Sequence, residues 1–310
     1  MLTFLPAGFE QYIAPQTDRL EFLREYLLKR GVCSSVIKIA ERKHLYVNFP
    51  SSAYDFSFKT KTVISHYDRV KGSPGANDNS AANFALADFS VRLNKISLQG
   101  ARHNTRVFFT DGEESREGGV FSQGAFALAS LFKKLKITND DVFVFDACGR
   151  GTVPILAKAG LESAEHMTKS AAKNAILFRK RFASLFERAL KILNEVSSES
   201  AVLPVPYSDN AGFLACGIPA VAITFLPKDE AALYTKNLID DKNLGKAVMN
   251  ARLSDTEARN CKEKMPVTWQ LFHTECDTPQ SLTAESFSLI AAILDKIAAA
   301  RFKTDLQKTF

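Results

Sequence analysis

The sequence KTVISHYDRVKGSPGANDNS, residues 61–80, contains a complete strand-to-helix connection. Residues 61–66 form a short apolar run that ends in polar residues, which is typical of a buried strand. Glycine, proline and asparagine then predict a loop, and apolar residues recur at helical spacing over 78–93. Ligands of α/β proteins bind where such strands end, so we expect His66 and Asp78 to lie near a functional site.

The same alternation continues along the chain. Short apolar runs of the strand type occur at 35–40, 45–49, 105–111, 141–146, 202–205 and 219–225. Helical patterns occur at 18–30, 123–136, 211–216 and 282–302, with a long basic helix around 169–191. Strands of this length that alternate with helices predict an α/β fold, in which a mixed, mostly parallel central sheet is covered by helices on both faces.

Length and composition describe one globular domain. The chain has 310 residues, of which 46% are apolar and 24% are charged, so a large core is available. No internal repeat, low-complexity tract or flexible linker divides it, and we predict a single domain over 1–310. Residues 228–268 are polar and lack a strand pattern, and we expect them to form an inserted, lid-like excursion over the site.

The charge distribution argues against a nucleic-acid partner. The 40 Lys and Arg residues exceed the 34 Asp and Glu residues by six. The most basic stretch, 169–191, also carries apolar residues at close to helical spacing, which is typical of the solvated side of an amphipathic helix. No nucleic-acid motif accompanies it.

A membrane or secreted protein is also disfavoured. No apolar run approaches the ~20 residues needed to span a bilayer. The start of the sequence lacks the basic flank and small-residue cleavage site of a secretory signal. No Cys-x-x-Cys pair occurs among the five cysteines, at positions 33, 148, 216, 261 and 276. Free thiols in the cytoplasm are therefore predicted.

Histidines and carboxylates that could bind metal follow the predicted strands and recur late in the chain: His66, Asp78, Glu113, Glu114, Asp146 and His273. Imidazole nitrogen and carboxylate oxygen without thiolate suit Zn²⁺ in a catalytic setting, with Mn²⁺ or Co²⁺ as alternatives. Even if one of the adjacent Glu113 and Glu114 stays free, two histidines and three acids exceed the three protein ligands of a usual catalytic zinc. They fit two metals about 3.5–4 Å apart that share a bridging carboxylate.

The adjacent Glu113 and Glu114 suit two different roles. Successive side chains of extended backbone point in opposite directions, so one carboxylate can bind metal while the other faces the attacking water. Metal-assisted hydrolysis needs such a free carboxylate to carry the proton. Asp68, two residues after His66, is placed to accept the other ring N–H of that histidine and so to orient it.

Taken in order, these motifs resemble those of the M28 family of zinc aminopeptidases, over about residues 15–302. The matching segments are His66-Tyr-Asp68, Gly75-Ala-Asn-Asp78-Asn-Ser80, Gly112-Glu113-Glu114, Asp146, Ser208-Asp209 with Gly217-Ile-Pro219, and His273-Thr-Glu-Cys-Asp277. The resemblance implies a zinc exopeptidase-like fold. It also implies a peptide substrate with a free N-terminus, from which one residue is removed per cycle.

The resemblance further implies two zinc ions and a role for each matching position. These roles are His66 and Asp146 as ligands of one zinc, Glu114 and His273 as ligands of the other, Asp78 as the bridge, Glu113 as the general base, Asp68 as the residue that orients His66, and Asp209 as a neighbour of the substrate.

Three departures from the family pattern bear on rate and specificity. Asn210 stands where the family often has histidine after Ser-Asp. Phe272 precedes the last metal histidine, where the family often has a tyrosine that can stabilise an oxyanion, and phenylalanine has no donor. Residues 116–119 lack the Gly-Ser that frequently opens the next helix.

Three alternatives remain. A glutaminyl-cyclase-like enzyme resembles the same family but uses one zinc for acyl transfer; such enzymes typically have tryptophan before the last histidine, and this chain has Phe272. A two-metal carboxypeptidase or deacylase of the M20 type usually carries an extra domain between Asp146 and His273, where little room is left. A non-catalytic interaction module would have lost ligands, and here the full set is present.

Overall fold

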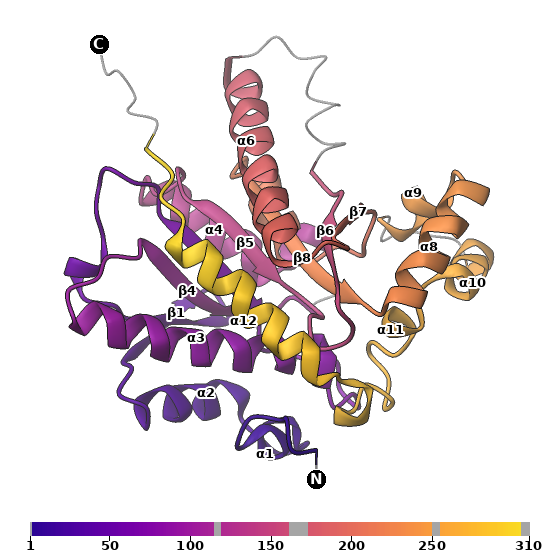
Figure 1. The fold of residues 1–310 in the computed structure, drawn as a ribbon, viewed down its shortest axis with the longest axis horizontal. Coiled ribbons are helices and arrows are strands. Elements are labelled where there is room, and N and C mark those ends of the chain that lie inside the picture. Colours follow the sequence, from indigo (N-terminus) through magenta and orange to yellow (C-terminus); the bar gives the residue numbers. More distant parts are fainter. Residues whose placement is uncertain (1, 115–118, 161–172, 250–254, 305–310) are drawn as a thin grey trace.

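The computed structural model describes residues 2–114, 119–160, 173–249 and 255–304 (Figure 1). Its centre is an eight-stranded sheet in the order β1-β2-β4-β3-β5-β8-β6-β7. The strands are β1 (Ser34–Ile39), β2 (Arg42–Val47), β3 (Lys61–His66), β4 (Thr105–Thr110), β5 (Asp141–Phe145), β6 (Val153–Ala157), β7 (Ala201–Leu203) and β8 (Ala220–Leu226).

The middle of the sheet is parallel and its margins are mixed. β4, β3, β5 and β8 run parallel to one another, whereas β1 and β2 form an antiparallel hairpin that continues antiparallel onto β4. On the other side, β6 runs antiparallel to β8 and parallel to β7. Every residue of β3, β5, β6 and β8 is buried, as expected for strands covered on both faces. The predicted α/β class with a mixed sheet is confirmed.

Helices cover both faces of the sheet. They are α1 (Phe9–Ile13), α2 (Arg19–Leu28), α3 (Ala81–Leu98), α4 (Gly124–Lys134), α6 (Lys173–Val196), α7 (Asn210–Ala215), α8 (Lys228–Asp240), α9 (Leu244–Val248), α10 (Asp255–Lys264), α11 (Val267–Gln270) and α12 (Ala284–Ala299). One core lies between the sheet and α2, α3, α6 and α12, and α3 and α12 lie side by side (Figure 1). The second core lies between the sheet and α4, α7 and α8–α11. Among the described residues, every helix is too short or too polar to cross a membrane.

β6 is not among the strands that the sequence predicts. Its sequence, Val-Pro-Ile-Leu-Ala, contains Pro154, which lacks the N–H that a central strand normally donates. The structure accommodates Pro154 because β7 pairs only with residues 155–157 of β6, so Pro154 has a strand neighbour on one side alone. Residues 228–268, predicted to lack strands, contain α8, α9 and α10 and the start of α11 in their described part.

A buried histidine two residues before β4 is held in its neutral form. His103 is 1% exposed; its Nδ1 accepts the N–H of Thr105 (3.0 Å), and its Nε2 lies 2.9 Å from the hydroxyl of Ser97. Burial, with the nearby positive charges of Lys61 and Arg301, lowers the pKa of His103 to about 4. The ring is therefore neutral in the folded protein at pH values where an exposed histidine gains a proton.

We predict that His103 makes the fold sensitive to acid. Between pH 6.5 and pH 4 the unfolded chain binds a proton that the folded chain excludes, so the free energy of unfolding falls as the pH falls. The expected loss from this residue between pH 7 and pH 5 is about 1–2 kcal/mol. Urea unfolding of the wild type and His103→Gln at both pH values measures it. The difference in unfolding free energy between the two proteins should be smaller at pH 5 than at pH 7. An unchanged difference would contradict the conclusion that His103 is neutral in the folded protein.

Candidate metal centre

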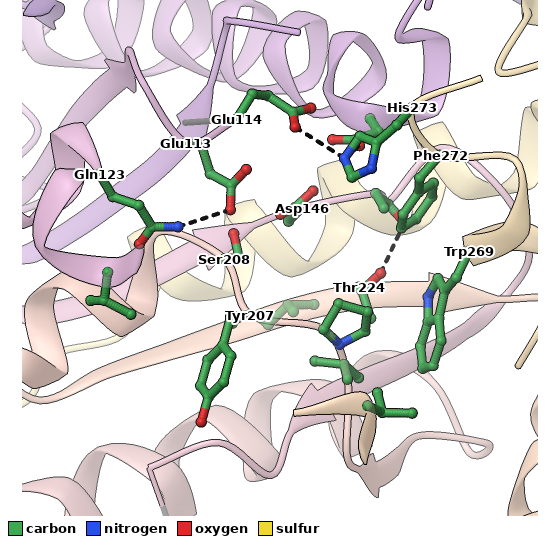
Figure 2. Close-up of a pocket in the computed structure, with 18 of the residues that line it drawn as sticks. Glu113, Glu114, Gln123, Asp146, Tyr207, Ser208, Thr224, Trp269, Phe272 and His273 are labelled. Carbon is green, nitrogen blue, oxygen red and sulfur yellow. Dashed lines mark hydrogen bonds and ion pairs between the residues drawn. The ribbon is translucent and has the colours of Figure 1, made fainter. Parts of the chain in front are cut away.

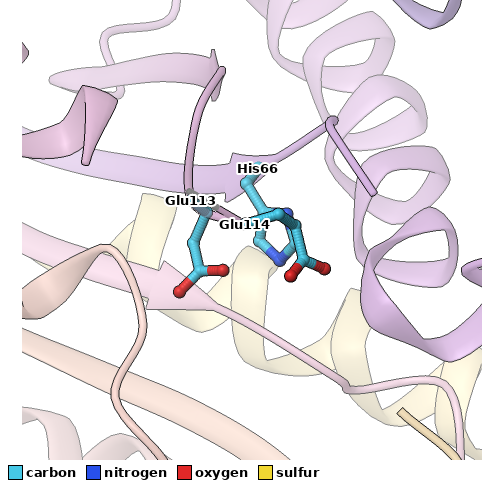
Figure 3. A group of neighbouring side chains, drawn as sticks. All are labelled: His66, Glu113 and Glu114. Atoms are coloured by element: carbon cyan, nitrogen blue, oxygen red, sulfur yellow. The ribbon is translucent and has the colours of Figure 1, made fainter. Parts of the chain in front are cut away.

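The ends of adjacent parallel strands bring the predicted residues together. His66, the last residue of β3, is fully buried and pairs with Thr110, the last residue of β4. Glu113 and Glu114 follow Thr110, and their carboxylates lie beside the His66 imidazole (Figure 3). Asp146 follows β5, which pairs with β3 on its other side. The register of three neighbouring strands therefore assembles this part of the site.

The Asp78 carboxylate lies between the two histidines. Its Oδ1 is 3.2 Å from His66 Nε2, and its Oδ2 is 3.3 Å from His273 Nε2. Asp277 holds the turn that carries it, because the two Asp277 carboxylate oxygens accept the N–H groups of Asn77 (2.8 Å) and Asp78 (3.0 Å). One oxygen of Asp78 thus faces each imidazole.

The helix expected from residue 78 begins later than predicted. α3 starts at Ala81, and Asp78 (φ −110°, ψ 85°) and Asn79 (φ −134°, ψ 31°) have non-helical backbone within the turn Ala76–Ser80. The N–H of Asp78 bonds to Asp277, 199 residues away in sequence, instead of entering a helical ladder. A long-range contact therefore overrides the local helical pattern.

Two groups of potential ligands share Asp78. His66, Asp78 and Asp146 form one group, and Asp78, Glu114 and His273 form the other. Asp146 Oδ1 is 3.6 Å from His66 Nε2, and Glu114 Oε2 is 3.0 Å from His273 Nε2. The structure thus brings together the residues of each predicted ligand set, and their role as ligands stays a prediction.

Asp68 holds the backbone of the glutamate pair. Its Oδ1 accepts the N–H of Glu113 (3.2 Å) and its Oδ2 accepts the N–H of Glu114 (3.0 Å). Its Oδ1 also lies 3.6 Å from His66 Nδ1, which is longer than a hydrogen bond, and the Asp68 carbonyl oxygen is nearer at 3.3 Å. The Asp68 carboxylate therefore holds the backbone of the two glutamates by hydrogen bonds, whereas it lies beyond hydrogen-bond distance of the His66 imidazole.

Burial and mutual charge shift the titration of the cluster. Burial raises the pKa of Glu113 well above its usual range, and the negative charge of Asp146 adds to the effect. Burial also raises the pKa of Glu114. For His273 burial lowers the pKa, but its bonds to Asp78 and Glu114 outweigh burial and raise the pKa to about 9. The carboxylates thus repel one another and stabilise positive charge between them.

The donor atoms fit a divalent metal ion. Glu114 Oε1 is buried without a hydrogen-bond partner, and His66 Nε2 is buried beside the carboxylates of Asp78 and Asp146 without a hydrogen bond of good geometry, although buried polar atoms are normally satisfied. Cations held by the two groups would give these atoms a partner and neutralise the crowded acids. Imidazole and carboxylate donors without thiolate suit zinc, so the residues present fit the predicted cofactor.

A cavity of about 410 Å³ opens onto the cluster (Figure 2). Asp78, Glu113, Glu114, Asp146 and His273 lie at its polar end. Its remaining wall is largely apolar and includes Val205, Ala222, Ile223, Val248, Trp269 and Phe272. The cavity therefore combines a cluster of charged groups with a hydrophobic wall, which is the usual composition of a small-molecule site.

Asp209, expected near the substrate, does not line this cavity. It is fully buried, and its Oδ2 accepts a hydrogen bond from the hydroxyl of Thr110, at the end of β4. Burial raises the pKa of Asp209 to about 7. The preceding residue, Ser208, does line the cavity. Asp209 thus lies behind the wall to which Ser208 contributes.

Several residues of the cavity wall belong to no motif in the sequence. Gln123 lines the cavity and its Nε2 donates to Glu113 Oε1 (3.3 Å), yet in the sequence it marked only the start of a helix. Trp269 and Val248 reach the wall from α11 and α9, in or next to a polar stretch with no alignable pattern. Trp269 is the one tryptophan of the chain, and tryptophan is enriched at binding surfaces. Its residue type was therefore the one feature of the sequence that could have indicated a place in the cavity wall.

Comparison with solved structures shows the same fold in several proteins. The LapA aminopeptidase from Legionella pneumophila superposes with a TM-score of 0.59 at 12% identity, over 96% of this chain and 73% of that chain. A Zn-dependent exopeptidase from Parabacteroides distasonis has a TM-score of 0.54 at 11% identity, over 95% and 96%. The glutaminyl cyclase from Porphyromonas gingivalis has a TM-score of 0.55 at 11% identity, over 93% and 94%. These likenesses show a zinc exopeptidase-like fold.

Comparison at the level of sequence gives the family. No curated protein matches the chain. The model of Peptidase family M28, however, matches residues 51–298, which contain β3 to β8 and all the residues of the metal-binding groups. The chain therefore belongs to peptidase family M28.

Proposed function

We propose that the protein is a two-zinc aminopeptidase that removes the N-terminal residue of peptides. The observation that carries the proposal is the Asp78 carboxylate, which presents one oxygen to His66 and the other to His273. A carboxylate in this position can bridge two metal ions, each completed by one further acid, Asp146 or Glu114. Membership of the M28 family and the fold shared with LapA aminopeptidase support it.

In the proposed reaction the chain positions the substrate and moves the proton. Bound zinc would polarise the scissile carbonyl and make water nucleophilic at neutral pH. Glu113 is not part of the two groups that share Asp78, and its carboxylate lines the cavity. It takes the proton of the attacking water and returns it to the departing amine. Asp68 fixes the backbone from which Glu113 projects.

The cavity suits the end of a peptide. Carboxylate oxygens at the polar end can accept hydrogen bonds from a free α-amine, and the apolar wall receives the first side chain. Val248 of α9 lies within residues 228–268, so the proposed excursion contributes to that wall. Phe272 places a ring without a hydroxyl beside His273, so any oxyanion donor is supplied by another group.

Replacement of Glu113 should slow turnover strongly and leave metal binding intact. Glu113→Gln removes the proton acceptor but preserves the shape of the side chain, so hydrolysis of aminoacyl-arylamides should fall by about 10²- to 10⁴-fold. Metal content, measured by elemental analysis after dialysis, should stay at the wild-type value. The exposed Glu285, at the start of α12, offers a matched control, and Glu285→Gln should keep full activity. Unchanged turnover in Glu113→Gln would show that another group is the base.

Metal stoichiometry separates the proposed function from its alternatives. We expect two equivalents of zinc per wild-type chain, about one in His273→Gln, and a loss of both in Asp78→Asn because the shared carboxylate is removed. Dialysis against defined zinc concentrations followed by elemental analysis measures these values. One equivalent in the wild type, together with cyclisation of an N-terminal glutamine, would instead favour a single-zinc acyltransferase. The absence of bound metal would favour an interaction module.

A further inference from the structure

Gln123 is the side chain in contact with the carboxylate of Glu113. Its Nε2 donates to Glu113 Oε1 at 3.3 Å (Figure 2), and its side chain is buried at the edge of the cavity. Within the described residues, no other side chain donates a hydrogen bond to this carboxylate. The amide oxygen of Gln123 is buried without a hydrogen-bond partner, so among the described residues the amide makes its one hydrogen bond to Glu113.

The helix that Gln123 precedes does not account for its presence. Gln123 is the N-cap residue of α4, with extended backbone (φ −65°, ψ 142°), but its side chain makes no capping hydrogen bond. N-cap positions favour Ser, Thr, Asp and Asn, whose short side chains reach the free N–H groups of the first turn. Here a longer side chain occupies the position and extends to Glu113 instead.

The backbone on which Gln123 stands is tightly packed. The N–H of Gly124 donates to the carbonyl oxygen of Gly112 (3.3 Å), next to Glu113. A Cβ atom at Gly124 would lie 1.7 Å from the carbonyl oxygen of Asp111, so only glycine permits this approach. The start of α4 is therefore fixed against the loop that carries Glu113, and Gln123 acts from a rigid base.

We propose that Gln123 is a positioning residue, which holds the carboxylate of Glu113 in its orientation toward the cavity. This inference rests on the proposed function, in which Glu113 is the general base. Asp68 fixes the main chain of Glu113, and Gln123 fixes the far end of its side chain. Anchoring at both ends restricts the carboxylate to one orientation, which a proton-transfer group requires.

Two substitutions separate positioning from structural support. Gln123→Met keeps the length of the side chain but removes the donor. Gln123→Asn supplies a better N-cap but withdraws the donor by one methylene group, so its melting temperature should equal or exceed that of the wild type. Both variants should lose about 10- to 100-fold in kcat, with KM for an aminoacyl-arylamide and zinc content close to wild type. Asn94→Leu, which removes an amide hydrogen bond to the Gly31 carbonyl remote from the site, is the control and should be fully active.

A double-mutant cycle with Glu113→Asp tests whether Gln123 acts through Glu113. The shorter aspartate cannot reach Gln123, so Gln123→Met should cause little further loss of kcat in that background. An equal loss in both backgrounds, or wild-type kcat in Gln123→Met and Gln123→Asn, would overturn the proposal.

A crystal structure of Gln123→Met gives a readout that does not depend on activity. The Glu113 carboxylate should leave its wild-type orientation or occupy more than one rotamer, and a single unchanged rotamer would contradict the inference. If the wild type hydrolyses no aminoacyl substrate, the proposed function fails, and the rotamer of Glu113 still decides the role of Gln123.

Discussion

The site depends on the contact between Asp277 and the turn that carries Asp78. The Asp277 carboxylate accepts two consecutive backbone N–H groups, and so prevents this segment from joining α3. Asp78 is left between His66 and His273, with an oxygen directed to each. Asp277 itself is fully buried, and burial raises its pKa to about 7. The buried Asp277 thus fixes the position of a second buried acid, Asp78. Two buried carboxylates this close together are stabilised when a cation binds beside Asp78.

The rest of the fold brings these acids to one place and holds them there. β3, β4 and β5 are parallel and adjacent, so the segments that follow them emerge at one edge of the sheet. Arg19 of α2 lies before residues 51–298, the part of the chain that matches the family, yet it stabilises the turn that contains Asp78. Its guanidinium donates to the carbonyl of Pro74 (2.7 Å) and to the hydroxyl of Ser80 (3.0 Å). The N-terminal helices therefore brace the turn that contains Asp78.

The sequence predicts what depends on local pattern and on residue type. The strand ends at His66 and Asp146 follow from apolar runs bounded by polar residues, and imidazole with carboxylate is enough to suggest zinc. The start of α3 could not be predicted, because it depends on a bond from Asp78 to Asp277, 199 residues later. Gln123 could not be singled out either, since its contact with Glu113 depends on how closely Gly124 packs on another segment.

The anchoring of residues 228–268 links the cavity wall to the metal centre. Arg150, in the loop after β5 that also carries Asp146, donates to Glu230 of α8 (2.9 Å) and to the hydroxyl of Thr268 in α11 (3.0 Å). Glu230 in turn accepts the N–H of Thr268 (2.7 Å). Both ends of the segment are therefore joined to each other and to the loop beside the ligands. Separation of either end from the loop would break charge-assisted bonds among largely buried groups, so these bonds hold the wall next to His273 in place beside the ligands.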